Sequence, residues 1–245
     1  MNQDSFLEVR IPLSSLDKKR GLCLPLQLTE DLAYLCGILV GDGSIYLRKE
    51  KHDFVIKCVG NPKDEQELYI DVIGPKFNRN FGFTPSFMHH DSRTTFGFAL
   101  HSKTLFRFLT EIVGLHHGRK NHALQIPPGI RKHPQFMDAF LRGLFDTDGC
   151  ITFKKRYREI PYYPVISLAS QSKKLIREVA LELRKRGLQL VEIYDYPVKN
   201  PRGIREYTFI NRIEMNGKDN LRKWQETIGF ESPKHLNKIR KWKEK

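Results

Sequence analysis

The sequence lacks a long apolar run. No stretch of its 245 residues approaches the roughly 20 apolar residues that a membrane-spanning helix needs. Residues 1–20 also lack the basic stretch followed by an apolar stretch that marks a secretory signal peptide. We therefore expect an intracellular protein, cytoplasmic in a prokaryote or organellar, that is not secreted and has no membrane partner.

Cysteine is scarce, and no two cysteines are spaced as Cys-x-x-Cys. The four are Cys23, Cys36, Cys58 and Cys150. Cys36 lies in an apolar helical run and Cys58 in a strand pattern, which favours buried free thiols. This usage suits a reducing compartment and argues against a structural zinc site.

Acidic residues are too few to balance the basic ones. The 42 Lys and Arg outnumber the 28 Asp and Glu, so the formal net charge is +14. This balance argues for a polyanionic partner. The 40% of hydrophobic residues suffices for packed cores, and the length allows one large domain or two of about 100–150 residues.

Two carboxylates end an apolar helical run near the middle of the chain. Residues 141–149 read Leu-Arg-Gly-Leu-Phe-Asp-Thr-Asp-Gly, and a strand pattern follows at 151–153. An acid at a helix C-terminus is unfavourable because the helix dipole is negative there, and a divalent cation would offset that cost. Gly149 is expected to take the left-handed conformation that often ends a helix. An ordinary solvated turn is the alternative interpretation.

A second copy of the pattern lies 106 residues earlier. Residues 35–43 read Leu-Cys-Gly-Ile-Leu-Val-Gly-Asp-Gly and precede another alternating strand pattern. The matched pairs are Gly37 and Gly143, Asp42 and Asp148, and Gly43 and Gly149. Asp146 is matched by Val40, so only Asp42 and Asp148 occur in both copies and are the candidates for chemistry.

The two stretches resemble the motif that gives the LAGLIDADG homing endonucleases their name. The resemblance covers most of the chain from about residue 28 onward. It implies a monomeric, site-specific enzyme that cuts both strands of double-stranded DNA at a long pseudo-palindromic target, using a divalent metal. The chain does not begin with Cys or Ser or end with His-Asn, as an intein would, which favours an intron-encoded or free-standing enzyme.

The expected elements repeat in the two halves. Helices are expected at 29–41, 64–80, 102–113, 136–147, 172–186 and 218–228, and strands at 44–49, 54–59, 84–90, 93–100, 150–157, 165–170, 190–196 and 206–213. Each half reads αββαββα, which fits an α+β fold with antiparallel sheets and pseudo-symmetric halves. The resemblance implies that the sheets form a DNA-binding saddle. We divide the chain into an extension (1–28), a first half (29–128) and a second half with a basic C-terminal tail (129–245).

Small residues recur four positions apart in both motifs. The pairs are Gly37 with Gly41 and Gly143 with Thr147. This spacing lets two helix backbones approach closely. We therefore predict a helix pair with Gly37 and Gly143 at its interface, which would bring Asp42 and Asp148 together.

Two adjacent carboxylates suit a metal ion, because like charges held close are otherwise costly. Mg²⁺ takes carboxylate and water oxygens, commonly bridges phosphate and lowers the pKa of bound water. We expect Asp42 and Asp148 to hold Mg²⁺ or another divalent cation, with Gly41 and Thr147 as neighbouring metal-site residues.

A lysine closes each half at a comparable place, Lys120 in the first and Lys234 in the second. Two surface lysines are the ordinary interpretation. The resemblance instead implies a basic residue that reaches the scissile phosphates or the catalytic water. Asn61 and Gln171 align after the second strand of each half, where the family often places a polar residue near the water, and helix capping is the alternative.

Alternation gives the strands after each motif one apolar and one polar face. A two-stranded ribbon fits the DNA major groove, where Arg and Lys read guanine, and bulk solvent is the other destination for such a face. The residues expected to contact DNA are Tyr46, Arg48, Lys57, Arg93, Thr95, Thr152, Lys154, Arg156, Arg158 and Ser167.

A non-cleaving nucleic-acid binder on the same fold is the alternative function. An intron-splicing maturase or a transcription regulator would fit the charge. Loss of one or both motif acids would favour it, and both acids are present. Intron RNA therefore stays open as a second partner. We interpret all nine histidines as non-ligands.

Overall fold

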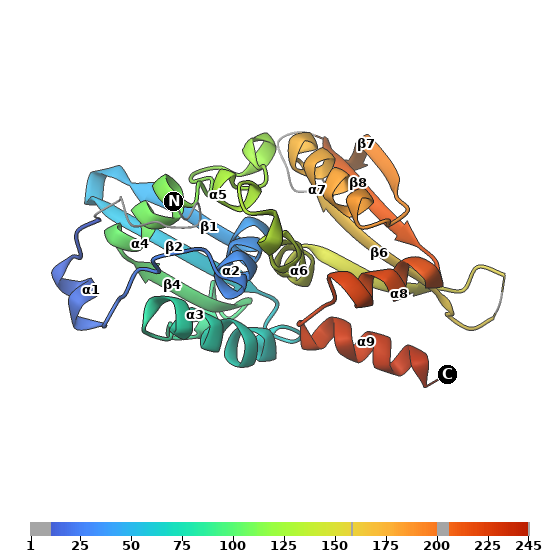
Figure 1. Ribbon diagram of the computed structural model, residues 1–245, viewed down its shortest axis with the longest axis horizontal. Coiled ribbons are helices and arrows are strands. Elements are labelled where there is room, and N and C mark those ends of the chain that lie inside the picture. The colour runs from blue at the N-terminus through green and yellow to red at the C-terminus, as the bar shows by residue number, and fades with distance from the viewer. Residues whose placement is uncertain (1–10, 158, 200–205, 245) are drawn as a thin grey trace. The chain divides into compact units, whose positions relative to one another are not determined.

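The computed structural model describes residues 11–157, 159–199 and 206–244. The chain forms two compact units, each with one four-stranded antiparallel sheet (Figure 1). The first unit comprises the chain up to Gly118, Pro127–Thr147 and Phe230–Leu236; the second comprises Arg119–Ile126, Asp148–Gly229 and the chain from Asn237. The predicted α+β fold with the order αββαββα in each half is confirmed.

The first unit has the strand order β1-β2-β4-β3. Its strands are β1 (Gly43–Arg48), β2 (Asp53–Gly60), β3 (Met88–His90) and β4 (Thr95–His101). Its helices are α1 (Ser15–Lys19), α2 (Glu30–Gly41), α3 (Gly74–Phe81), α4 (Lys103–Arg107), α5 (Pro128–Arg131) and α6 (Met137–Thr147). Alternate side chains such as Ile45, Ile56 and Phe98 form the buried face of the sheet.

The second unit has the equivalent order β5-β6-β8-β7. Its strands are β5 (Gly149–Lys154), β6 (Tyr163–Ser170), β7 (Val191–Lys199) and β8 (Tyr207–Asn216), and its helices are α7 (Lys173–Lys185) and α8 (Lys218–Thr227). Helix α9 (Pro233–Lys243) starts in the first unit and ends in the second. Short 3₁₀ turns lie at Lys49–Lys51, Asn121–Ala123 and Pro134–Phe136.

Side-chain caps fix where three helices begin. Thr29, Ser102 and Ser172 each accept the backbone N–H of the residue three positions later, at 3.0, 3.0 and 3.2 Å. This bond satisfies an amide that would otherwise have no partner inside the helix. The helix predicted at 29–41 is therefore confirmed, with Thr29 as its cap and Glu30 as its first residue.

The helix expected at 64–80 is irregular. Leu68–Ile73 is a π-helical turn that continues into α3. A π turn has a wider repeat than an α turn and shifts the buried positions to Tyr69 and Ile73. Ile70, although apolar, therefore faces solvent, and its side chain is 51% exposed. A second π turn, Phe108–Ile112, extends α4.

Three predicted strands are shorter than expected, and two of these differences move a predicted DNA contact. Strand β5 ends at Lys154, and Arg156 takes a left-handed φ of 48°, so Arg156 lies in a turn rather than on the alternating face. Arg93 also has a positive φ, 65°, and lies in the turn before β4. The strand expected from residue 84 begins only at Met88, because Pro85 cannot donate to a ladder.

The expectation of a left-handed Gly149 is wrong. Neither Gly149 nor its counterpart Gly43 has a positive φ, and each is the first residue of a strand. A Cβ atom on Gly43 would stand 2.4 Å from the carbonyl oxygen of Leu39. This motif glycine is therefore needed for close backbone approach between helix and strand.

The cysteines are free, as predicted, with Cys36 and Cys58 buried. Burial raises the pKa of the Cys36 thiol well above its ordinary value, which makes a thiolate there unfavourable. Among the residues that the structure describes, no helix is both long and apolar enough to cross a membrane.

Candidate active site

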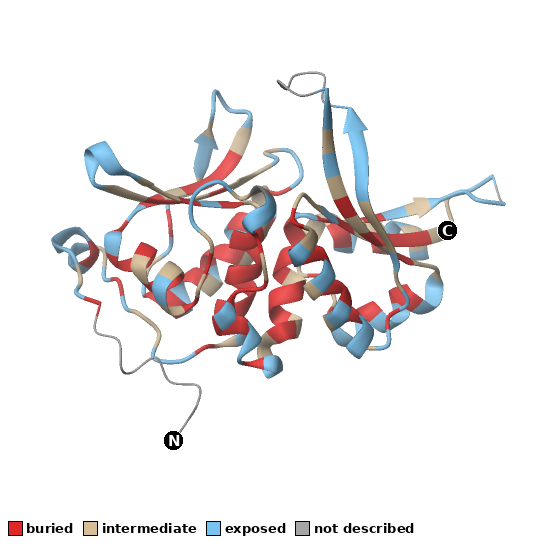
Figure 2. Ribbon diagram, turned by 90° about the horizontal axis from the view of Figure 1, so that it is seen from above, coloured by how far each residue is buried: buried red, intermediate tan, exposed pale blue. Residues whose placement is uncertain are grey.

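Helices α2 and α6 lie side by side in the first unit (Figure 1), and their backbones come closest at two glycines. A Cβ atom on Gly37 would stand 2.1 Å from the carbonyl oxygen of Phe140. One on Gly143 would stand 2.1 Å from the carbonyl oxygen of Tyr34. These neighbours are backbone atoms, so a side chain at either glycine would force the helices apart. Both helices are coloured almost entirely as buried in Figure 2.

A motif acid follows each helix. Asp42 caps α2, and its backbone N–H donates to the carbonyl oxygen of Ile38. Asp148 comes directly after α6 and is exposed. Each helix ends four residues after its glycine, about 6 Å at 1.5 Å per residue. Both motif acids therefore follow within about two turns of the helix crossing.

The predicted metal-site residues beside the acids are the last residues of the two helices. Gly41 ends α2 and Thr147 ends α6. The Thr147 hydroxyl lies 3.2 Å from the carbonyl oxygen of Gly143 and 3.1 Å from that of Leu144, and it is turned back onto its own helix. The last carbonyls of a helix carry the negative end of its dipole, so both ends favour a cation.

Asp146, the motif acid without a counterpart in the first motif, has the contacts of a residue that supports the structure. Its side chain is completely buried and accepts hydrogen bonds from the Tyr34 hydroxyl (2.7 Å) and the Glu231 backbone N–H (3.0 Å). Burial raises the pKa of Asp146 to about 7, although these hydrogen bonds oppose the shift. Asp146 thus joins α6 to α2 and to the segment Phe230–Leu236.

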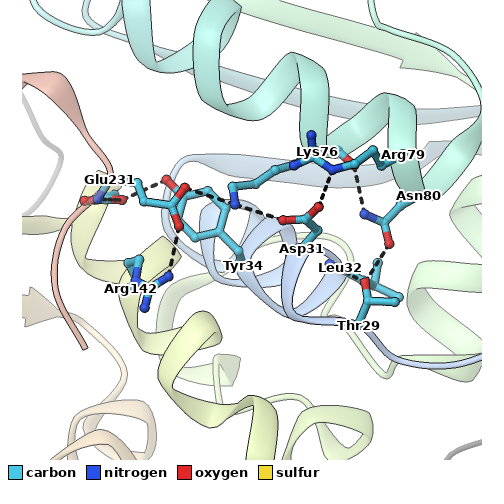
Figure 3. Close-up of polar contacts among 10 residues, drawn as sticks. Thr29, Asp31, Leu32, Tyr34, Lys76, Arg79, Asn80, Arg142 and Glu231 are labelled. Atoms are coloured by element: carbon cyan, nitrogen blue, oxygen red, sulfur yellow. Dashed lines mark hydrogen bonds and ion pairs between the residues drawn. The ribbon is translucent and has the colours of Figure 1, made fainter. Parts of the chain in front are cut away.

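Charged side chains extend this connection across the first unit (Figure 3). The Lys76 ammonium lies 2.9 Å from Asp31 and 3.0 Å from Glu231, and 4.7 Å from the centre of the Tyr34 ring. Arg142 pairs with the other oxygen of Glu231 at 2.9 Å. The network fixes the segment that carries Lys234 against α2, α3 and α6.

Lys234 is brought to the first motif acid by a residue that no sequence pattern marked. Its ammonium lies 2.8 Å from Oε1 of Glu65, whose side chain is only 6% exposed. A Cβ atom on Gly60 would meet Glu65 Oε2 at 2.0 Å and Asp42 Oδ2 at 3.3 Å, so both carboxylates border the same space. No local signal pointed to Glu65, because its partner lies 169 residues away.

Asn61 lies at the edge of this cluster. Its backbone N–H donates to Glu65 Oε2 at 2.6 Å, while its side-chain oxygen accepts the Lys63 N–H at 2.9 Å. The Asn61 side chain therefore caps the turn after β2, which is the alternative role considered for it.

The segment with Lys120 belongs to the second unit, where it packs beside Gln171. The His122 ring nitrogen Nδ1 lies 3.0 Å from the Gln171 carbonyl oxygen, and the Ser172 hydroxyl donates to the carbonyl oxygen of Leu124. Gln171 thus meets this segment through its backbone carbonyl. The structure therefore groups Lys120 with Gln171, and Lys234 with Asn61, so each closing segment packs in the unit of the other half.

Four predicted DNA contacts share the outer face of the first sheet. Strand register places Tyr46, Arg48, Lys57 and Thr95 on the side opposite the core. Lys57 pairs with Asp91 at 2.8 Å, and the same carboxylate oxygen accepts from the Thr95 hydroxyl at 3.0 Å. This face therefore combines basic side chains with an acid.

Three predicted contacts share the outer face of the second sheet. They are Thr152, Lys154 and Ser167, with Thr152 and Lys154 exposed. The Arg156 guanidinium stacks 3.6 Å from the centre of the Tyr163 ring. Arg158 lies outside the described residues.

The donor atoms near Asp42 are oxygens, as Mg²⁺ prefers. Burial, then the neighbouring Cys58, Asp42 and Glu65, hold the pKa of Tyr69 well above its ordinary value, so its hydroxyl stays neutral beside these groups. Within the described residues, no group of three or more His, Cys, Asp or Glu side chains is arranged for a metal ion. Mg²⁺ is commonly held by one or two carboxylates and water, so this donor set fits it.

Residues 135–229 match the family model of the LAGLIDADG-like domain. The chain is 26% identical over 242 residues to the tRNA-splicing ligase RtcB of Methanopyrus kandleri, covering 92% of this chain and 22% of that protein. It is 23% identical over 186 residues to the protein MJ0314 of Methanocaldococcus jannaschii, covering 75% and 64%. The chain thus spans less than two thirds of each of these relatives.

Two homing endonucleases bound to DNA have similar structures. I-WcaI on its DNA recognition sequence has a TM-score of 0.56 at 15% identity, covering 95% of this chain and 96% of that chain. I-DmoI with DNA and Ca has a TM-score of 0.55 at 15% identity, covering 86% and 97%. Identities this low carry the fold alone. The resemblance seen in the motifs is confirmed: residues 135–229 match a LAGLIDADG-like domain, and the chain has the fold of the LAGLIDADG homing endonucleases.

Proposed function

We propose that the protein is a site-specific DNA endonuclease that cuts both strands with a divalent cation, Mg²⁺ in the first instance. The observation that carries this proposal is the close crossing of α2 and α6 at Gly37 and Gly143. Each helix leads directly into a motif acid, Asp42 or Asp148. One chain therefore contains the two acids that a double-strand cut needs, and it would act as a monomer.

The charge and the relatives support DNA as the substrate. The net charge of +14 suits a polyanion, and the outer sheet faces carry Arg48, Lys57 and Lys154. I-WcaI and I-DmoI, which share the fold, are bound to DNA. The proposed substrate is a duplex whose phosphates these side chains neutralise and whose base edges they contact in the major groove.

The residues divide the chemistry between them. Asp42 and Asp148 would hold the cation beside the carbonyl ends of α2 and α6, next to Gly41 and Thr147. Bound Mg²⁺ would stabilise charge on the phosphate and make a bound water more acidic. Lys234 would place a positive charge near the scissile phosphate of one strand, and Lys120 near that of the other.

Cleavage of a DNA library tests the function. We expect Mg²⁺-dependent double-strand breaks at one sequence, identified by sequencing the ends, and none after chelation with EDTA. Asp42→Asn and Asp148→Asn should each lower double-strand cleavage at least about 100-fold, because a lost metal contact removes several kcal/mol of transition-state stabilisation. Binding in a gel-shift assay should remain.

Asp138→Asn is the matched control, since it makes the same change at the other end of α6. It should cut like the wild type. An Asp42→Asn or Asp148→Asn protein that cuts both strands at the wild-type rate would show that the altered residue is not a metal ligand. Binding of DNA or intron RNA without any cleavage would favour the maturase or regulator alternative.

A further inference from the structure

Glu65 is a buried acid at the edge of the candidate site. Its side chain is 6% exposed, and both carboxylate oxygens have hydrogen-bond partners. Oε1 accepts from the Lys234 ammonium at 2.8 Å, and Oε2 accepts from the Asn61 backbone N–H at 2.6 Å. The turn after β2 therefore supplies one donor, and the first turn of α9 supplies the other.

The backbone leaves room for this carboxylate. A Cβ atom on Gly60 would stand 2.0 Å from Glu65 Oε2 and 3.1 Å from its Cδ, and 3.3 Å from Asp42 Oδ2. Gly60 lies in β2 without a positive φ, so its conformation alone does not call for glycine. The missing side chain is what lets Glu65 reach in beside Asp42.

Two carboxylates in one partly enclosed space repel each other, and a buried charge is costly unless it is paired. Lys234 supplies a positive charge at this place. The pair benefits both residues: Lys234 neutralises the buried charge of Glu65, and Glu65 restrains Lys234. This restraint matters because a lysine side chain has four flexible methylene groups and must lose rotamer freedom to act at a fixed point. Glu65 therefore restricts where the Lys234 ammonium can lie.

The second half has no equivalent acid. Asn61 aligns with Gln171, so Glu65 corresponds to Leu175, an apolar residue that is 1% exposed. At that place the Ser172 hydroxyl accepts the Leu175 N–H and donates to the carbonyl oxygen of Leu124. The closing segment of the first half is held in part through its backbone, by the Leu124 carbonyl oxygen and by the Ile126 N–H, which donates to Glu178 Oε2 at 2.7 Å. Lys234 is held by a direct side-chain pair with Glu65.

We propose that Glu65 is a positioning residue that holds the Lys234 ammonium in the half-site of Asp42, so that cleavage of one particular strand depends on it. The inference rests on the proposed endonuclease function. It assigns the placement of Lys234 to a residue that the second half replaces with Leu175, and it makes the two strands of the target unequal in their sensitivity to mutation of Glu65.

Strand-resolved nicking tests the proposal. The target duplex carries a different fluorophore on each strand, and the rate of cutting of each strand is measured in Mg²⁺. In Glu65→Gln the side-chain oxygen can still accept the Asn61 N–H, but the charge that holds Lys234 is gone. We expect the strand that Lys234→Met slows to be slowed about tenfold or more by Glu65→Gln, and the other strand to change less than about twofold.

The double variant separates positioning from a general loss of structure. If Glu65 acts through Lys234, Glu65→Gln combined with Lys234→Met is no slower than Lys234→Met alone. Glu67→Gln is the matched control, because Glu67 lies two residues away and is exposed. It should leave both strands unchanged. Should Glu65→Gln not fold, Glu65→Asp keeps the charge on a shorter arm and should slow the same strand to a smaller extent.

A second readout does not depend on cleavage. Acetylation of lysines, followed by mass spectrometry, should modify Lys234 more rapidly in Glu65→Gln than in the wild type, while Lys241 reacts equally in both. Equal slowing of both strands, slowing of the strand that Lys234→Met spares, or unchanged Lys234 reactivity would each overturn the proposal. Wild-type protein that nicks neither strand would instead overturn the proposed function, and this inference with it.

Discussion

Helices α2 and α6 are alike in backbone and unlike in polar chemistry. Both have a glycine at the crossing, and both lead into an acid. At the offset of 106 residues, however, Tyr34 corresponds to Phe140 and Asp146 corresponds to Val40. The hydrogen bond between Tyr34 and Asp146 is thus matched by two apolar residues, both buried.

The difference shows which motif positions carry the repeated function. Residues that must be the same in both helices are those that set backbone approach or follow the helix end. Asp146 is free to differ because it serves a connection that only one helix makes, to the Glu231 backbone. An acid in such a motif is therefore not catalytic merely because it is an acid.

Substitution of either glycine at the crossing of α2 and α6 should give the largest effect on stability. A Cβ atom at Gly143 or Gly37 would stand 2.1 Å from a backbone oxygen. We expect Gly143→Ala and Gly37→Ala each to lower the free energy of unfolding by at least about 3 kcal/mol, at the upper end of overpacking costs. Urea denaturation measures this, and double-strand cleavage should fall in parallel.

Gly74→Ala is the control within the same unit. Gly74 begins α3, and its new Cβ would meet the Phe87 ring at 3.1 Å and the Thr84 methyl at 3.4 Å, which are side chains that can shift. Its effect should stay within about 1 kcal/mol, partly because alanine favours helix. Equal effects of Gly74→Ala and Gly143→Ala would show that the crossing is not tightly packed.

The second difference between the helices is that α6 has the buried Asp146 where α2 has Val40. It should give the next largest effect, which is a dependence of the free energy of unfolding on pH. Burial raises the folded-state pKa of Asp146 to about 7 from an unfolded value near 3.8, so the folded protein binds the proton more tightly. The resulting stability is fully present below about pH 4 and is lost as the pH rises through about 7. Asp146→Asn cannot ionise but keeps an oxygen acceptor for Tyr34.

We therefore expect the wild type to lose roughly 2–3 kcal/mol relative to Asp146→Asn between pH 5 and pH 8. Urea denaturation at both pH values measures the difference. Asp138→Asn, on the first turn of the same helix, should follow the wild type. A pH-independent difference between the wild type and Asp146→Asn would mean that Asp146 has the same charge in both states.

Much of the fold followed from local patterns in the sequence. The caps at Thr29 and Ser172 and the apolar periodicity of α2 and α6 act within a few residues, so a pattern can show them. Close packing at Gly37 and Gly143 became predictable only because the spacing occurs twice.

The remaining features depend on contacts between distant parts of the chain. Glu65 meets Lys234 across 169 residues, and nothing near Glu65 marks it as different from an exposed helix acid. The π turn at Leu68–Ile73 changes the phase of a helix without changing its composition. The left-handed turn residues Arg93 and Arg156 continue an alternating pattern in sequence, although the chain has already left the strand.

The two sheets offer a second comparison, on their outer faces. On the first, Lys57 is paired with Asp91, and hydrogen bonds from Lys57 and then Thr95 hold the pKa of Asp91 below its usual range. On the second, β5 presents Lys154 as an exposed residue. A phosphate that approaches Lys57 must therefore compete with an acid that is ionised at neutral pH.

Replacing Asp91 tests this difference between the two sheets, and it should give the smallest effect of the three sets of variants. We expect Asp91→Asn to raise DNA affinity about three- to tenfold at low salt and to steepen the dependence of log K on log salt by up to about 0.9, the value for one further phosphate neutralised. Fluorescence anisotropy over a salt series measures both.

Asp219→Asn is the control for net charge. It changes the net charge equally and also breaks an ion pair, with Arg222 on α8 at 3.1 Å, but it lies off the outer face. An equal gain in Asp219→Asn would show that total charge, and not release of Lys57, sets the affinity. An unchanged slope in Asp91→Asn would place Lys57 away from the phosphates.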